Sequence, residues 1–247
     1  GRMFLVDMEE GRIIEDREVK EKIAAKHPYG DWLKENLLPL KEVPYTGNKT
    51  PVEAEPFIKR LQAFGYTEED IKTLITPMST LGKEAIGSMG TDTPLAVLSS
   101  KPQLLYNYFK QLFAQVTNPP LDGIREEIVT DTSMSVGSDA NIFDVIPAHA
   151  KKLNIQNPII SNEDLDKIKF IEHDDFKSKS VKALYVAKEG NNGLERALED
   201  LLKSVVKEVE NGANIIILSD RGINKDMAPM PMLLACAFVH HGMMKHN

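Results

Sequence analysis

The sequence is poor in cysteine and in long apolar runs. Cys236 is the one cysteine among 247 residues, so the sequence supplies neither an internal disulfide nor a multi-cysteine metal or iron–sulfur site, and it fits a reducing, cytoplasmic compartment. No apolar stretch approaches the length of a membrane span, and the first residues, GRMFLVD, have the features of neither a signal peptide nor a transit peptide. We therefore expect a protein with no membrane partner.

An excess of positive charge is also lacking. The formal net charge is −7, and the 30 lysines and arginines are scattered among 37 carboxylates rather than clustered. This pattern gives no electrostatic footprint for nucleic acid, so we expect no nucleic-acid partner. With 42% apolar and 27% charged residues, the composition is typical of a globular protein.

The first half of the sequence predicts a hairpin followed by helices. Residues 3–6 and 12–14 are short β-prone runs separated by a Glu-Glu-Gly turn, and residues 16–26 form a charged segment with helical character. Thr67, three residues before Asp70, is placed to cap a helix. Residues 95–98 suit a strand or a buried turn. Ser99 or Ser100 then caps a helix that we expect to be deeply buried, because apolar residues recur at helical spacing up to Val116. Pro119 and Pro120 end this helix.

The second half predicts a parallel βαβα unit. Residues 181–187 are predicted to form a strand, and Asn192 to cap the start of a long amphipathic helix. Asn211-Gly212 is predicted to end this helix with a residue in the left-handed backbone conformation. Residues 215–218 form a continuous apolar strand of the kind buried on both faces, and residues 231–244 form an apolar helix. Such units form parallel sheets, so the fold class is α/β. A polar loop at residues 130–141 separates the two halves.

Two loops are candidate binding sites. Residues 87–94, GSMGTDTP, can present backbone N–H groups to an anion, although tight turns use the same residues and the complete phosphate-loop pattern is absent. Asp220 and Arg221 follow a parallel strand, at the edge where α/β folds bind ligands, but they can equally pair with each other or cap the next helix. We favour a structural role for both loops.

The histidines and the cysteine give no metal site. His240 and His241 are adjacent and therefore diverge on a helix, and the remaining histidines have no partner at ligand spacing. Cys236 lies in the apolar run LLACAFV, so we expect a small buried hydrophobe.

Several segments together resemble one family. They are GRMFLVDMEEGRII at the start, KEAIGSMGTDTPLAVLSSKPQLLYNYFKQLFAQVTNPPLDGIREE from residue 83, PAHAKKLNIQNPIISNEDLDKI in the middle and IIILSDRGINKDMAPMPMLLACAFVHH near the end. In this order they resemble the central domain of glutamate synthase, preceded by the tail of its amidotransferase domain. The resemblance implies three parts: residues 1–44 as the amidotransferase tail, 45–130 as a mainly helical linking part, and 131–247 as an α/β lobe similar to a partial β/α barrel.

The resemblance also implies a function for the loops. The intact family enzyme splits glutamine, passes ammonia through an internal tunnel and forms glutamate from 2-oxoglutarate at a flavin site. Ser88, Thr91, Thr117 and Asn118 become candidate residues of the tunnel lining, and Asp220 and Arg221 candidate residues of a loop or domain contact. Neutral ammonia needs a narrow passage that is poor in water and lacks an acid that would trap it as ammonium.

The same resemblance places the chemistry outside these residues. It implies FMN and an iron–sulfur cluster for the parent enzyme, with no catalytic, cofactor or metal residue in this segment, which we expect to be inactive alone. Its partners are the amidotransferase and FMN-binding domains of the same chain, with a small NADPH-oxidising subunit or ferredoxin supplying electrons. The alternative is a free-standing α/β enzyme or binding domain for a small phosphorylated or acidic ligand; a protein-binding scaffold with an exposed apolar patch is a third hypothesis.

Overall fold

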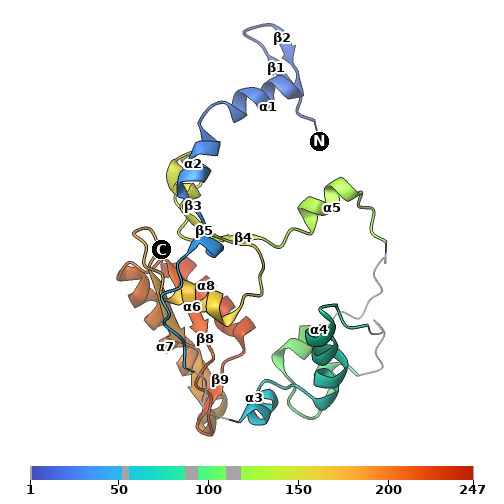
Figure 1. Ribbon diagram of the computed structural model, residues 1–247, viewed down its shortest axis with the longest axis vertical. Helices are drawn as coiled ribbons and strands as arrows, with labels where there is room; N and C mark the ends of the chain where they lie inside the picture. Colours follow the sequence, from blue (N-terminus) through green and yellow to red (C-terminus); the bar gives the residue numbers. More distant parts are fainter. Residues whose placement is uncertain (1, 52–55, 87–93, 110–117, 247) are drawn as a thin grey trace. The chain divides into compact units, whose positions relative to one another are not determined.

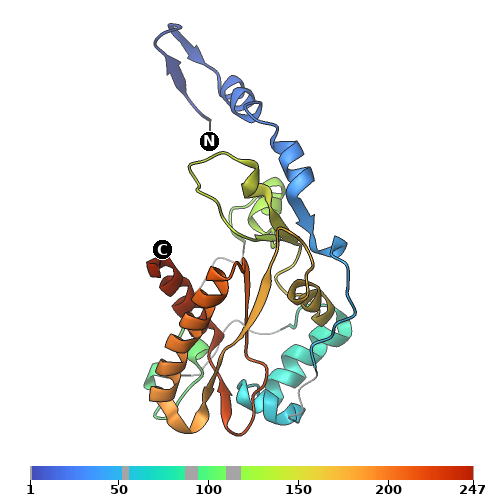
Figure 2. The same cartoon turned by 90° about the vertical axis from the view of Figure 1, so that its left-hand side faces the viewer.

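The computed structural model in Figures 1 and 2 describes residues 2–51, 56–86, 94–109 and 118–246. The chain forms two compact units. The first combines residues 1–48 with residues 130–177, and the second combines residues 49–129 with residues 178–247. Each unit therefore assembles from two separate stretches of the sequence.

The first unit begins with the predicted hairpin. Strands β1 (Leu5–Asp7) and β2 (Arg12–Ile14) pair antiparallel, and Gly11 takes the positive φ of 64° that the turn requires. Helix α1 (Asp16–Ala24) follows directly, with two acidic residues in its first turn where they face the positive end of the helix dipole. The predicted hairpin and helix are both confirmed.

A three-stranded sheet forms the core of the first unit. Helix α2 (Tyr29–Asn36) runs into β3 (Leu37–Pro39), which pairs parallel with β5 (Lys152–Ile155); β4 (Met134–Val136) pairs antiparallel with the other edge of β5. Helix α6 (Asn162–Lys169) follows β5. Leu153, in the central strand, is completely buried.

The second unit contains the predicted βαβα unit. Strands β6 (Ser178–Lys182) and β8 (Ile215–Ser219) pair parallel and are joined through α7 (Gly190–Glu210), and α8 (Met232–His246) packs against α7. Both helices lie beside the strands in Figure 2. Strands β7 (Leu184–Val186) and β9 (Met227–Pro229) form a second, antiparallel pair. The α/β class is confirmed, and the described strands form no closed barrel.

A small apolar cluster holds α7, α8 and the strands together. Its buried members are Ala183, Leu198, Leu201, Met230 and Ala235. The helix α7 ends as predicted: Gly212 has φ 89°, and its N–H donates to the carbonyl of Val209 at 2.8 Å.

Two details of this unit differ from the prediction. Asn192 does not cap α7, because the helix begins at Gly190, whose positive φ of 56° already turns the chain into the helix. Of the apolar strand, Ile215 is buried whereas the residues after it are half-buried, since β8 pairs with a strand along one side among the described residues.

Short helices make up the rest of the second unit. They are α3 (Phe57–Ala63), a π-helical turn (Asp70–Ile75) continuing into α4 (Thr76–Leu81), and α5 (Gly123–Val129). Thr67 caps the helical segment that contains the π-helical turn, as predicted. Its Oγ1 accepts from the Asp70 N–H at 3.1 Å, and the Asp70 carboxylate accepts from the Thr67 N–H at 2.9 Å. This reciprocal arrangement is a capping box.

Residues 95–98, predicted to form a strand or a buried turn, form a turn that is exposed, and the described start of the predicted buried helix is not an α-helix. Ala96–Leu98 and Leu105–Phe109 form 3₁₀ turns whose large side chains are mostly exposed, and residues 110–116 lie outside the described ranges. An apolar stripe forms a buried helix only when another surface covers it. Cys236, expected to be buried, is also exposed, since it lies on the side of α8 away from the cluster.

Candidate functional site

The structure leaves the predicted tunnel residues untested. Ser88, Thr91 and Thr117 lie outside the described residues, as does most of the GSMGTDTP loop. Asn118 is described: it is exposed and lies in a bend directly before Pro119.

Asp220 and Arg221 lie where the sequence predicted, at the carboxyl end of a parallel strand. Both directly follow β8 and are half-buried. The Arg221 N–H donates to Ser219 Oγ at 3.4 Å. Asp220 and Arg221 each take part in at least one further interaction with the rest of the protein. Gly222 then takes φ 101°, and a β-carbon there would lie 3.5 Å from Leu184 Cδ1. The loop thus changes direction at a residue whose backbone conformation other side chains rarely adopt.

Asn224 and Ile223 fix the far side of this loop. The Asn224 side-chain oxygen accepts from the N–H groups of Asp226 and Met227 at 2.9 and 3.0 Å, and the backbone N–H of Asn224 donates to the Met227 carbonyl at 3.1 Å. Ile223 is buried. These contacts lock the connection between β8 and β9 from both ends, which agrees with a structural role for the Asp-Arg-Gly turn. Asn224 is not among the residues predicted from the sequence, although Asn is a common first residue of an Asx turn.

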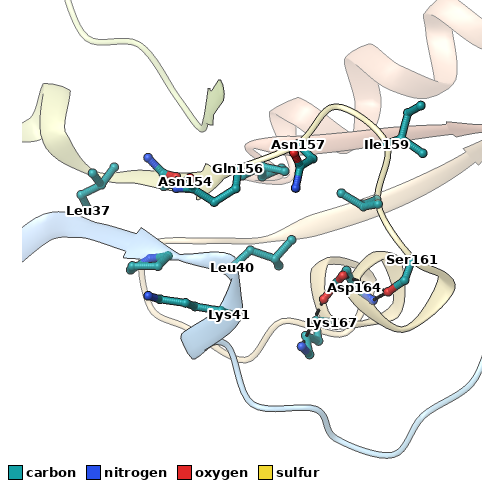
Figure 3. A pocket seen from close by; sticks show the side chains of 13 residues that line it. Leu37, Leu40, Lys41, Asn154, Gln156, Asn157, Ile159, Ser161, Asp164 and Lys167 are labelled. Carbon is teal, nitrogen blue, oxygen red and sulfur yellow. Dashed lines mark hydrogen bonds and ion pairs between the residues drawn. The ribbon is translucent and has the colours of Figure 1, made fainter. Parts of the chain in front are cut away.

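A hollow in the first unit lies at the carboxyl ends of its two parallel strands. It encloses about 530 Å³ between the end of β3, the loop after β5 and the first turns of α6 (Figure 3). Parallel strands commonly place ligands at this edge. Its lining is Leu37, Pro39, Leu40, Lys41, Asn154, Ile155, Gln156, Asn157, Ile159, Ile160, Ser161, Asp164 and Lys167.

Three polar groups in this hollow are paired with one another. Ser161 Oγ accepts from the Asp164 N–H at 3.0 Å and donates to the Asp164 carboxylate at 2.9 Å, and Lys167 Nζ donates to the same carboxylate at 3.1 Å (Figure 3). These hydrogen bonds, first that from Ser161, hold the pKa of Asp164 below its ordinary value. The helix N-terminus thus carries its own anion, which would repel a phosphate group.

Metal ligands do not gather in the described residues. No group of three or more His, Cys, Asp or Glu side chains there is placed to hold an ion. The rings of His240 and His241 meet edge to face, with centroids 5.4 Å apart. With a single cysteine, the sequence cannot supply the several thiolates of an iron–sulfur cluster. We assign neither FMN nor a cluster to this segment.

No helix in the described residues combines the length and apolar character needed to cross a bilayer.

Comparison with known families decides what the chain is. A model of the family described as "Glutamate synthase central domain" matches residues 59–247. The chain belongs to this family. A second model, "Glutamine amidotransferases class-II", matches residues 1–32, which contain the hairpin, α1 and the start of α2. The junction between an amidotransferase and the glutamate synthase central domain therefore lies between residues 32 and 59.

Curated relatives match the central domain together with its amidotransferase tail. The glutamate synthase [NADPH] large chain of Bacillus subtilis is 40% identical over 245 residues, which are 99% of this chain. The glutamate synthase [NADH] of Schizosaccharomyces pombe is 37% identical over 258 residues and covers the whole chain. Ferredoxin-dependent glutamate synthase 2 of Synechocystis is 36% identical over an alignment of 249 residues that covers 99% of this chain.

The matched part is a small share of each relative. The chain spans 16% of the Bacillus protein, 12% of the Schizosaccharomyces protein and 16% of the Synechocystis protein. The segment is therefore less than a fifth of the length of each of these relatives.

Proposed function

We propose that this segment connects the two reaction centres of a glutamate synthase. It joins the glutaminase site to the FMN-containing synthase site, in an enzyme that makes glutamate from glutamine and 2-oxoglutarate. The observation that carries the proposal is the order of the two family matches in one chain, amidotransferase at residues 1–32 and central domain at residues 59–247. A segment that contains this junction is covalently attached to both functions.

The segment performs no reaction of its own in this account. In this proposal, the glutaminase nucleophile, FMN and the iron–sulfur cluster belong to other parts of the parent chain. The relatives are named for NADPH, NADH or ferredoxin as electron donors, so the parent draws electrons from one of these carriers or from a small subunit that oxidises NADPH. The partners of the segment are the amidotransferase and FMN-binding domains of its own chain.

The three parts divide this connecting work. Residues 1–44 complete the amidotransferase, residues 45–130 link it to the next part, and residues 131–247 form the α/β lobe. We propose these limits for the parent chain; the two compact units cross them, because β5 pairs with β3 from the first part. That pairing ties the amidotransferase tail to the α/β lobe through backbone hydrogen bonds.

The tunnel lining is assigned to four polar residues, Ser88, Thr91, Thr117 and Asn118. Hydroxyl and amide groups can exchange hydrogen bonds with neutral ammonia without protonating it, whereas a carboxylic acid would trap it as ammonium. Asp220 and Arg221 are assigned to a contact between domains, which the anchored loop around Asn224 would hold at a fixed position.

The coupling of the two activities tests this role. In the full-length parent enzyme, Thr117→Trp fills the passage with an indole ring, so we expect the ratio of glutamine hydrolysed to 2-oxoglutarate consumed to rise. The matched control, Thr117→Ser, keeps the hydroxyl and is expected to leave the ratio unchanged. If Thr117→Trp gives the wild-type ratio while both activities persist, the tunnel assignment of Thr117 is wrong.

A further inference from the structure

The hollow beside α6 carries opposite charges on its two sides. Lys41, in the 3₁₀ turn Leu40–Glu42 that follows β3, contributes an ammonium group, and Asp164, in the first turn of α6, contributes a carboxylate. Figure 3 shows the two side chains on opposite sides of the hollow, with Leu40 between them. A molecule that fills the hollow would therefore meet a cation at one end and an anion at the other.

The ammonium group of Lys41 is not committed to another part of the described chain. Its exposed side chain has no hydrogen bond or ion pair among the described residues. The side-chain amide of Asn157, which also lines the hollow, has no hydrogen bond to a described residue either. Both groups can donate hydrogen bonds, so this side of the hollow can bind a carboxylate group.

The carboxylate of Asp164 can accept a further donor. Its two oxygens accept from Ser161 Oγ at 2.9 Å and from Lys167 Nζ at 3.1 Å, one bond each. A carboxylate oxygen has about two acceptor positions, so each oxygen keeps one for a ligand. The Asp164 side chain is 34% exposed, whereas that of Lys167 is 14% exposed, so a ligand reaches the carboxylate more readily than the ammonium group.

The neighbouring charges make this side of the hollow net negative. Lys167 Nζ lies 3.8 Å from the Glu163 carboxylate as well as 3.1 Å from that of Asp164, so one cation faces two anions. Hydrogen bonds hold the pKa of Asp164 below its ordinary value, and the group is therefore ionised at neutral pH. A cationic group of a ligand is favoured here, and a second anion is repelled.

Apolar side chains lie between the charged groups. Leu37, Leu40, Ile155 and Ile160 line the hollow, and Leu40 and Ile155 are buried. An apolar chain can pack against them, whereas a charge at the same place would lose its water without gaining a partner. The volume of about 530 Å³ lies within the range of about 300–1,000 Å³ that is typical of small-molecule sites.

We propose that the hollow binds a small zwitterion whose carboxylate and ammonium groups stand at opposite ends of a short apolar chain. The carboxylate binds Lys41 and Asn157, the apolar chain packs on Leu40 and Ile155, and the ammonium group binds Asp164. ω-Amino acids, and amino acids whose side chain ends in an amine, have this chemistry.

The site lies where the two family matches meet. Residues 37–41 fall between the amidotransferase match, which ends at residue 32, and the central-domain match, which begins at residue 59. Strand β5 and helix α6 lie within the central-domain match. A ligand bound to Lys41 and Asp164 together would hold the junction against the central domain. The binding itself does not depend on the proposed connecting function.

Hydrogen exchange in the full-length parent enzyme tests the site, with 6-aminohexanoate as the probe. This molecule carries its two charged groups at the ends of an unbranched apolar chain and is a substrate of neither proposed reaction. Mass spectrometry follows the peptides that cover residues 37–42 and 152–168. We expect exchange to slow in both regions as the probe concentration rises. Hexanoate and hexylamine, each of which lacks one charged group, should have little effect.

Variants that remove one charge separate the two ends of the site. Lys41→Met and Asp164→Asn should each weaken the binding of 6-aminohexanoate roughly tenfold. The matched controls Lys34→Met and Asp174→Asn, at exposed residues outside the lining, should change it by less than about twofold. Asp164→Glu keeps the anion and should still bind the probe, which distinguishes loss of the charge from damage to α6.

Three results would overturn the assignment. Exchange that the probe slows in neither region would show that the hollow does not bind the zwitterion. Equal effects of hexanoate or hexylamine would show that one charged group suffices, and equal binding by all the variants would place the probe elsewhere on the enzyme. None of these results depends on the glutamine-to-2-oxoglutarate ratio, so failure of this site and failure of the connecting function are told apart.

Discussion

Leu201 gives the sharpest test of how the second unit is held together. This side chain is 3% exposed and lies in the middle of α7 within the cluster of Ala183, Leu198, Met230 and Ala235. Leu201→Ala removes three carbons, and at about 0.8 kcal/mol for each buried carbon the transfer loss is about 2.4 kcal/mol. The cavity left behind adds to this loss, within the total of about 2–5 kcal/mol found for such changes.

The neighbours of Leu201 place the expected loss near the middle of that range. Ala183 and Ala235 have no flexible side chain that could move into the cavity, while Met230 can partly fill it. We therefore expect the free energy of unfolding to fall by about 3 kcal/mol. With a urea dependence of about 1–3 kcal/mol per molar, the unfolding midpoint should fall by about 1–3 M.

Circular dichroism in the far ultraviolet is an appropriate measurement, because α7 and α8, with 21 and 15 residues, are the two longest helices of the described residues. Trp32, the one tryptophan, lies in the first unit and reports that unit by fluorescence. The control is Leu98→Ala, the same substitution at a side chain that is 74% exposed, with an expected change below about 0.5 kcal/mol. Equal effects of the two substitutions, or a loss below about 1 kcal/mol at Leu201, would refute the reasoning.

Three further changes have defined outcomes. Gly212→Ala should cost about 1 kcal/mol, because the residue ends α7 with positive φ, whereas Gly30→Ala in α2 should gain up to about 1 kcal/mol; urea midpoints moving in the same direction would contradict this. Ser161→Ala should cost about 1 kcal/mol by removing the cap of α6, and Ser161→Asn, which can still cap, should restore most of it in the same measurement. The pKa of Asp164 is lowered by hydrogen bonds from Ser161 and Lys167, so its contribution to stability is present above its ordinary value of 3.8 and is lost as the pH falls below it. In thermal melts from about pH 6 to about pH 2, the melting temperature of Asp164→Asn should fall less with decreasing pH than that of the wild type. Equal falls in melting temperature would contradict the pairing of Asp164 with Ser161 and Lys167.

Local signals in the sequence predicted the elements that depend on neighbouring residues. The hairpin, the Thr67 capping box and the Gly212 end of α7 each rest on hydrogen bonds within a few residues, so the pattern alone determines them. The apolar face of α7 was also predicted correctly, because its cluster lies within the same βαβα unit.

Long-range packing accounts for what the sequence did not reveal. Cys236 and the residues before Phe109 were expected to be buried, but burial depends on a covering surface, and an apolar run does not specify what covers it. Asp220 and Arg221 were placed correctly at the strand end, whereas the role of Asn224 depends on the return of the chain to β9. The hollow beside α6 brings together residues more than a hundred positions apart, which no local pattern could show.

The central claim, that this segment connects two reaction centres and makes no bonds itself, is tested most directly by its own activity. The purified 247-residue chain should be assayed for glutamine hydrolysis, and for glutamate formation from 2-oxoglutarate and ammonia with reduced electron donor and added FMN, beside the full-length parent enzyme. The account predicts both activities for the parent and neither for the segment. Turnover of either substrate by the segment alone would contradict it.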